Sequence, residues 1–142
     1  MRVLLDTNVA LRVFDAGSTD YGRLNAAIAR LRAAGCIPTV APQVLYEAYV
    51  VLTRGPNENG WGLSPDEAVK ALAAYSSACE LLPDPAGLTQ EWLTVCADHE
   101  VRGKQAHDAR LVAFMRLHGI AELATLNPGD FSRYTEIQTV KM

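Results

Sequence analysis

Short apolar segments alternate along the chain with longer segments in which apolar residues recur every three or four positions. The short segments have the length of strands, and the longer ones have the period of helices. We expect strands at residues 3–5, 37–41, 80–82, 122–126 and 137–140. We expect helices at residues 8–15, 21–34, 42–54, 65–79 and 86–100, and a last helix that has Asp108 in its first turn and continues to residues 118–119. Strands that alternate with helices predict an α/β fold with a parallel sheet.

Some of these helices also have recognisable ends. Pro42 suits the first turn of the third helix, and Ser64, Pro65 and Glu67 form the pattern of a capped helix start. The longest irregular segment, residues 55–63, lies between these two helices and contains Trp61. Trp61 either packs onto the core of its own domain or anchors a partner, since tryptophan is favoured at interface hot spots.

Acidic residues occupy three positions that the pattern would otherwise make apolar or leave to a helix cap. Asp6 directly follows the first apolar strand, Glu47 lies in line with two valines of its helix, and Asp108 extends the apolar face of another helix. Each has an ordinary interpretation as well. Asp6 and Asp108 suit helix starts, and a glutamate at the edge of an apolar stripe often reaches solvent.

The predicted fold brings these acids together. Strand ends and helix starts share one edge of a parallel sheet, so Asp6, Asp108 and the turn at residues 127–130 should converge there, with Glu47 approaching from the side. Clustered carboxylates repel one another unless protons or cations neutralise them, and a cluster of oxygen ligands suits Mg²⁺ or Mn²⁺. The pattern therefore favours phosphoryl transfer or phosphodiester hydrolysis. No GxSxG motif and no glycine-rich phosphate loop is present.

Composition narrows the picture further. A chain of 142 residues, 49% of them hydrophobic, is long enough to bury the core of one domain. Cys36, Cys79 and Cys96 match no zinc pattern, so we expect reduced and mostly buried thiols. No apolar run is long enough to span a bilayer, and Asp6 interrupts the apolar stretch at the N-terminus that a secretory leader would need. We therefore expect a cytoplasmic protein that does not bind a membrane. The net charge of −3 argues against a protein that binds nucleic acid over a broad surface, but not against a nuclease whose acidic site binds cations.

Four sequence segments in this order resemble the PIN-domain ribonucleases, and most of all the VapC-type toxins of bacterial toxin–antitoxin pairs. The segments are residues 4–8 (Leu-Leu-Asp-Thr-Asn), Glu47 on its helix, residues 102–109 and residues 125–131. The resemblance covers nearly the whole chain. It implies one PIN domain over residues 1–142, with a three-layer α/β fold whose parallel sheet has the order 3-2-1-4-5 and is flanked by helices.

The resemblance also implies an endoribonuclease that uses Mg²⁺, with Mn²⁺ as a substitute. The family's metal-site acids fall on Asp6, Glu47 and Asp108, and its fourth site position falls on Asn127. We expect Asp6 and Asp108 to bind the metal, and Glu47 to complete its ligands or orient the attacking water. Because the amide of Asn127 is neutral and lowers the negative charge of the site, it is left open whether a second metal ion binds. Supporting positions are Thr7, Asn8, Thr125 and Asp130.

The expected partners are an RNA substrate, a cognate antitoxin and a second copy of the chain. Basic residues near the predicted site would hold RNA phosphates: Arg12, Arg54, Arg102, Lys104 and Arg110. The alternatives are a housekeeping RNA-processing PIN nuclease and a catalytically inactive PIN module that only binds. A haloacid-dehalogenase-type phosphatase would need a second aspartate two residues after Asp6. Asn8 occupies that position, which argues strongly against this class of enzyme.

Overall fold

The apolar segment near the start of the chain forms the central strand of a parallel sheet. In the computed structural model, which describes residues 1–142, the sheet has the order β3-β2-β1-β4-β5. Every neighbouring pair of strands is parallel. The strands are β1 (Arg2–Leu5), β2 (Ile37–Val40), β3 (Glu80–Leu81), β4 (Glu122–Ala124) and β5 (Gln138–Val140). The predicted α/β class and strand order are confirmed.

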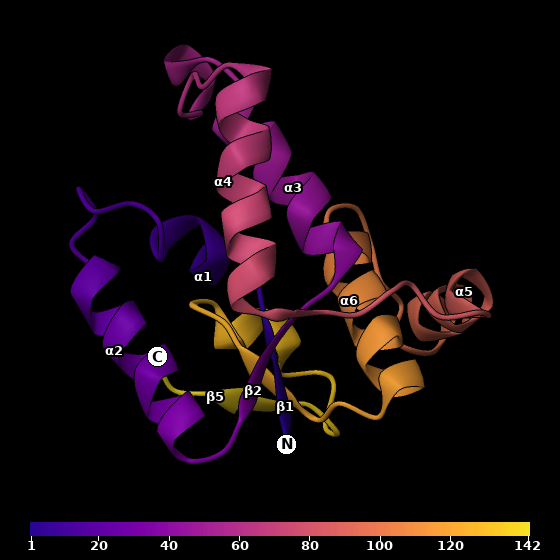
Figure 1. Cartoon of the computed structure of the whole chain (residues 1–142). Helices are drawn as coiled ribbons and strands as arrows, with labels where there is room; N and C mark the ends of the chain where they lie inside the picture. Colours follow the sequence, from indigo (N-terminus) through magenta and orange to yellow (C-terminus); the bar gives the residue numbers. More distant parts are fainter.

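Helices lie on both sides of this sheet, with α1 and α2 on one side and α5 and α6 on the other (Figure 1). The helices are α1 (Thr7–Arg12), α2 (Tyr21–Ala33), α3 (Pro42–Thr53), α4 (Pro65–Ala78), α5 (Leu88–Asp98) and α6 (Gln105–His118). The α3–α4 pair projects beyond the sheet, with the short 3-10 helix η1 (Pro56–Glu58) near its tip (Figure 1). A second 3-10 helix, η2 (Pro128–Phe131), follows β4. None of these helices combines the length and apolar character that crossing a bilayer requires.

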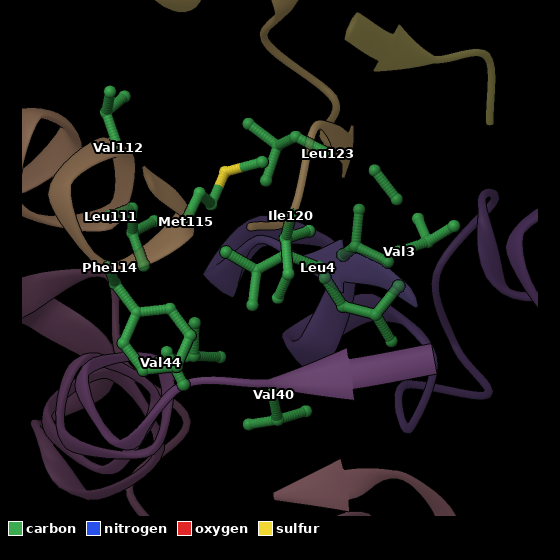
Figure 2. Close-up of a cluster of buried hydrophobic side chains, with 14 of the residues drawn as sticks. Val3, Leu4, Val40, Val44, Leu111, Val112, Phe114, Met115, Ile120 and Leu123 are labelled. Atoms are coloured by element: carbon green, nitrogen blue, oxygen red, sulfur yellow. The ribbon is translucent and has the colours of Figure 1, made fainter. Parts of the chain in front are cut away.

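The core forms where α6 packs against the central strands. Leu111, Phe114 and Met115 of α6 are almost fully buried, with the Phe114 ring beside Val44 of α3 and Met115 extending toward Leu123 of β4 (Figure 2). Burial of one such side chain stabilises a fold by about 1.5–3 kcal/mol. The indole of Trp92 on α5 donates a hydrogen bond of 2.9 Å to the carbonyl of Ala106, which fastens α5 to the start of α6. The start of α6, where Asp108 lies, is therefore held rigidly against the sheet.

Several predicted boundaries are wrong, and three of them have a clear local reason. Helix α1 ends at Arg12 instead of Asp15, because the Asp15 carboxylate accepts a hydrogen bond from the Gly17 amide and closes a turn of its own. Helix α5 begins at Leu88 instead of Ala86, since Gly87 before it has a left-handed φ of 83°. Strand β4 ends at Ala124, two residues early, because the next residues leave the sheet for the polar cluster described below.

The cysteines also differ from expectation. Cys36, Cys79 and Cys96 are free thiols, as predicted, but each is only partly buried at the margin of the core. They cap the edges of the apolar cluster, whose centre is filled by larger aliphatic and aromatic side chains.

Candidate active site

A buried carboxylate lies where β1 ends. Asp6 is 7% exposed, and its two oxygens accept hydrogen bonds from the Thr125 hydroxyl at 2.8 Å and from the Thr7 amide at 2.7 Å. Thr7 opens α1 and Thr125 follows β4. Asp6 is thus the N-cap of α1 and also a member of a polar cluster at the carboxyl edge of the sheet. The helix-cap interpretation of Asp6 is confirmed, and its role as a metal ligand stays a prediction.

Asn8 ties α1 to the segment after β4. Its amide nitrogen donates to the Thr125 hydroxyl at 3.3 Å and to the Asp6 carboxylate at 3.4 Å. Its amide oxygen accepts from the Leu126 backbone N–H at 3.2 Å. Because that N–H bonds a side chain instead of a neighbouring strand, β4 stops before it. Asn8 therefore links the start of α1 to the segment that follows β4.

Glu47 approaches the cluster from the side, as its place on α3 predicted. The side chain is half-buried, less deeply than its alignment with two valines suggested. One carboxylate oxygen accepts from the Thr7 hydroxyl at 2.8 Å, and the other accepts from the Gln43 amide at 2.7 Å. Gln43 was missed in the sequence, although it precedes Glu47 by four residues and so shares its helix face.

Asp108 completes the cluster from the first turn of α6. The pKa of its half-buried carboxyl is raised to about 6, first by burial and then by the negative charges of Asp6, Asp130 and Glu47. Burial also raises the pKa of Asp6, although the hydrogen bonds from Thr125 and Thr7 oppose this shift. The structure therefore brings Asp6, Glu47, Asp108 and Asp130 into one electrostatic site.

The fourth position of the site differs from the sequence expectation. The Asn127 side chain is exposed and makes no hydrogen bond, while its backbone N–H donates to the Thr125 hydroxyl at 3.1 Å. The negative charge of Asp130, three residues later on η2, acts on both Asp6 and Asp108. Asp130 was expected only as a supporting residue. It is the acid of this turn whose negative charge raises the pKa values of Asp6 and Asp108.

The donor chemistry of the cluster fits a hard divalent cation. Its side chains offer carboxylate, hydroxyl and amide oxygens, and no thiol or imidazole is part of it. The raised pKa values of Asp6 and Asp108 show negative charge that a cation would neutralise. As the side chains lie, however, no three of them are close enough to form a metal-ligand group. The oxygens of Asp6 and Glu47 are instead directed at protein donors, so a cation would have to draw the acids together.

The basic residues expected to hold RNA have different surroundings. Arg102 and Lys104 are exposed beside the start of α6. Arg12 and Arg54 line a surface groove of about 610 Å³ at the far ends of α1 and α3. Arg110 instead donates to Asp84 at 3.1 Å and to Gln43 at 3.2 Å. Arg12 is held in a similar way, by Asp20 at 3.5 Å and by the Asn8 carbonyl at 3.2 Å, so the phosphate contacts expected of both arginines stay predictions.

Trp61 packs partly against its own domain. It lines a small apolar pocket between α1, α3 and α4 together with Leu11, Phe14 and Leu72, and it also borders the groove that contains Arg12. Of the two roles that the sequence allowed for Trp61, packing onto its own domain is therefore observed. The indole remains partly exposed, and its role at an interface stays a prediction.

Family membership follows from comparison of the whole sequence. The model of the PIN domain matches residues 3–137. The chain belongs to the PIN-domain family. No curated protein matches this PIN domain at the sequence level.

Solved structures share the fold over nearly the whole length of this PIN domain. VapBC2 from Rickettsia felis, bound to a promoter DNA fragment, superposes with a TM-score of 0.73 at 16% identity, covering 100% of this chain and 99% of the other. Mycobacterium tuberculosis VapC20, described as a sarcin–ricin loop cleaving toxin, gives 0.67 at 22% identity and covers 93% and 95%. DNA-bound VapBC from Salmonella typhimurium gives 0.71 at 14% identity and covers 99% and 97%.

The raised pKa of Asp108 predicts how stability depends on pH in metal-free protein. Between about pH 4 and 6 the folded protein holds a proton that the unfolded chain has lost, so the free energy of unfolding should fall as pH rises through this window. Asp108→Asn should remove this loss and be more stable than wild type by about 1 kcal/mol at pH 7, a value reduced for the solvent screening of a half-exposed group. Near pH 4 the two should be equal. Urea unfolding in EDTA from pH 4 to 7 measures both, and a difference that does not change with pH would contradict the assignment.

Proposed function

We propose that this PIN domain is an endoribonuclease that hydrolyses RNA phosphodiester bonds with Mg²⁺, for which Mn²⁺ can substitute. The observation that carries the proposal is the gathering of four carboxylates at the carboxyl edge of the sheet, where the pKa of Asp108 is raised to about 6. An acidic site of this kind cannot hold a phosphate without a cation. The same acids at the same edge would repel RNA if the domain only bound it.

Asp6 and Asp108 would hold the cation, from the end of β1 and the start of α6. When bound, a divalent cation neutralises the scissile phosphate and lowers the pKa of a water molecule. Glu47, held from two sides by Thr7 and Gln43, would orient the attacking water. Water attack at phosphorus should leave a 5′-phosphate and a 3′-hydroxyl. Asn127, with help from Thr125 or Asp130, would hold a second cation or a water molecule.

RNA phosphates would contact the basic residues around this edge. Arg102 and Lys104 lie in the connection just before α6, near Asp108, and are exposed. Arg12 and Arg54 lie farther along α1 and α3 and border the groove next to Trp61. Such contacts hold the backbone of RNA and read no sequence.

A toxin role is favoured by the kind of protein that shares the fold. Several of these structures are VapBC toxin–antitoxin complexes, and one is a toxin that cleaves the sarcin–ricin loop. We propose that this chain acts in the cytoplasm as the toxin of such a pair, as a homodimer inhibited by a cognate antitoxin. A small open reading frame for a DNA-binding protein that overlaps or abuts this gene would favour the toxin over a housekeeping RNA-processing nuclease.

The direct test is cleavage of total RNA by the purified protein in Mg²⁺, with and without EDTA, read by mapping of the new ends. The proposal expects discrete cuts that carry 5′-phosphates and that EDTA abolishes. Cleavage that persists in EDTA, or that leaves a 2′,3′-cyclic phosphate, would contradict a metal-dependent hydrolysis. RNA that is bound but not cut would favour the catalytically inactive module instead.

The loop from Gly55 to Leu63 should take part in antitoxin binding, with Trp61 as an anchor. It follows the helix that bears Glu47, so a partner that grips it can also cover the active site. Trp61→Ala should weaken association with the protein encoded by the adjacent gene by about 2 kcal/mol, as loss of an interface hot spot does. Because Trp61 also packs on Phe14 and Leu72, the melting temperature should fall as well. Calorimetry, with affinity expressed per folded molecule, separates the two effects, and an unchanged affinity would remove the interface role.

A further inference from the structure

A buried amide lies between α3 and α6, next to the acids but outside the set that the sequence predicted. Gln43 is 5% exposed. Its amide nitrogen donates to Glu47 at 2.7 Å and to the His107 carbonyl at 2.8 Å. Its amide oxygen accepts from Arg110 at 3.2 Å. Both N–H groups and the carbonyl of this side chain therefore have partners, which is what a buried amide requires.

The partners of Gln43 also determine which way its amide points. A guanidinium can only donate, so the Gln43 oxygen must face Arg110. The nitrogen must then face Glu47, which as a carboxylate can only accept. Arg110 is itself held by Asp84 at 3.1 Å from the loop before α5. A chain of directed contacts thus runs from Asp84 through Arg110 and Gln43 to Glu47.

Glu47 receives this contact on one oxygen and the Thr7 hydroxyl on the other. The two donors come from different elements, α3 and α1, so the carboxylate is fixed in both direction and rotation. Both donors, a glutamine amide and a threonine hydroxyl, are neutral. The second N–H of the same amide nitrogen donates to the His107 carbonyl, one residue before Asp108. Gln43 therefore links the helix of Glu47 to the helix turn of Asp108.

We propose that Gln43 is a positioning residue that holds Glu47 in register with Asp108, and that Arg110 and Asp84 act through Gln43 to fix its orientation. The inference rests on the proposed metal-dependent nuclease and adds to it a residue set that contacts neither metal nor RNA. Outer partners of this kind that orient metal-site groups typically change metal affinity or activity by about 10–100-fold when removed.

The test compares Gln43→Met, Arg110→Met and the double variant. Mn²⁺ affinity is measured by calorimetry on the RNA-free protein, and kcat and KM are measured on a short RNA that the wild type cuts. Gln43→Met should lower Mn²⁺ affinity and kcat by about 10-fold or more and leave KM unchanged. Arg110→Met should do the same more weakly, because the amide can then rotate. The double variant should be no worse than Gln43→Met alone, since both changes break one chain of contacts.

Gln138→Met is the matched control, because this glutamine lies on β5 opposite Glu122, at the amino end of β4 and away from the site. Its Mn²⁺ affinity and kcat should equal those of the wild type. Arg110 is partly exposed, so Arg110→Met should fold even if Gln43→Met does not. The inference then requires that Arg110→Met still bind Mn²⁺ more weakly than the wild type.

Two results would overturn the inference. Wild-type Mn²⁺ affinity and kcat in Gln43→Met would show that the amide does not position Glu47. A raised KM in Arg110→Met, with effects that multiply in the double variant, would show that Arg110 contacts RNA directly. Failure of the proposed function itself would be visible in the wild type, as absence of both Mn²⁺ binding and EDTA-sensitive cleavage.

Discussion

Asp6→Asn should abolish RNA cleavage by this PIN domain while leaving its fold intact, and Asp108→Asn should do the same. Both carboxylates are expected to contact the metal directly. Metal-ion catalysis contributes several kcal/mol, and loss of about 3 kcal/mol lowers a rate by roughly 100-fold. RNA cleavage in Mg²⁺ and growth arrest on expression measure the effect.

The fold should survive because asparagine can replace most of what Asp6 does locally. Asparagine caps a helix about as well as aspartate, so the bond from the Thr7 amide can remain. The Thr125 hydroxyl, which now donates to Asp6, would have to release one of the two N–H groups that it accepts, from Asn8 or Asn127, to accept from the new amide nitrogen, a local cost that the rest of the fold can absorb. The control is Asp66→Asn, an exposed change on α4 that should retain full activity. Substantial Mg²⁺-dependent cleavage by either site variant would remove these acids from the reaction.

Glu47→Gln should lower kcat by about 10-fold to 100-fold while metal binding persists more weakly. The substitution keeps the size of the side chain but removes its charge. It also leaves one oxygen for two donors, since Thr7 and Gln43 now bond separate oxygens of the carboxylate. Single-turnover cleavage measures the chemical step, and Mn²⁺ calorimetry measures binding.

Glu58→Gln provides the control for Glu47→Gln, because Glu58 is exposed on η1 and contacts no member of the cluster. It should behave as the wild type in both measurements. A Glu47→Gln enzyme with unchanged kcat would show that the half-buried Glu47 has no part in orienting the water.

Local chemistry in the sequence was enough to find much of the site. Asp6 stands out because a carboxylate ends a buried strand, and Asp108 because it opens a helix whose next turns are apolar. Convergence of the two follows from the rule that parallel strands end at one edge of the sheet. The capped start of α4 at Ser64 follows from Ser64, Pro65 and Glu67 alone, and the structure contains the complete capping box. The order of the strands, by contrast, came from the family resemblance.

What the sequence did not reveal depends on contacts between distant elements. Gln43 looks like an ordinary helix residue until α6 brings His107 and Arg110 against it. The ion pair between Arg110 and Asp84, 26 residues away, is equally invisible in the sequence. The effect of the Asp130 charge on Asp6 and Asp108 likewise depends on how the turn of η2 is placed beside β1 and α6. Neither periodicity nor spacing contains this information.

The most direct measurement of the central claim is anomalous diffraction from crystals soaked in Mn²⁺, collected for the wild type and for Asp6→Asn. The account predicts a manganese peak at the carboxyl edge of the sheet, with Asp6 and Asp108 as ligands and Glu47 facing the bound water, and no such peak in the variant. Crystals of an enzyme that cleaves RNA in Mn²⁺ but show no manganese between Asp6 and Asp108, or show it elsewhere, would contradict the account.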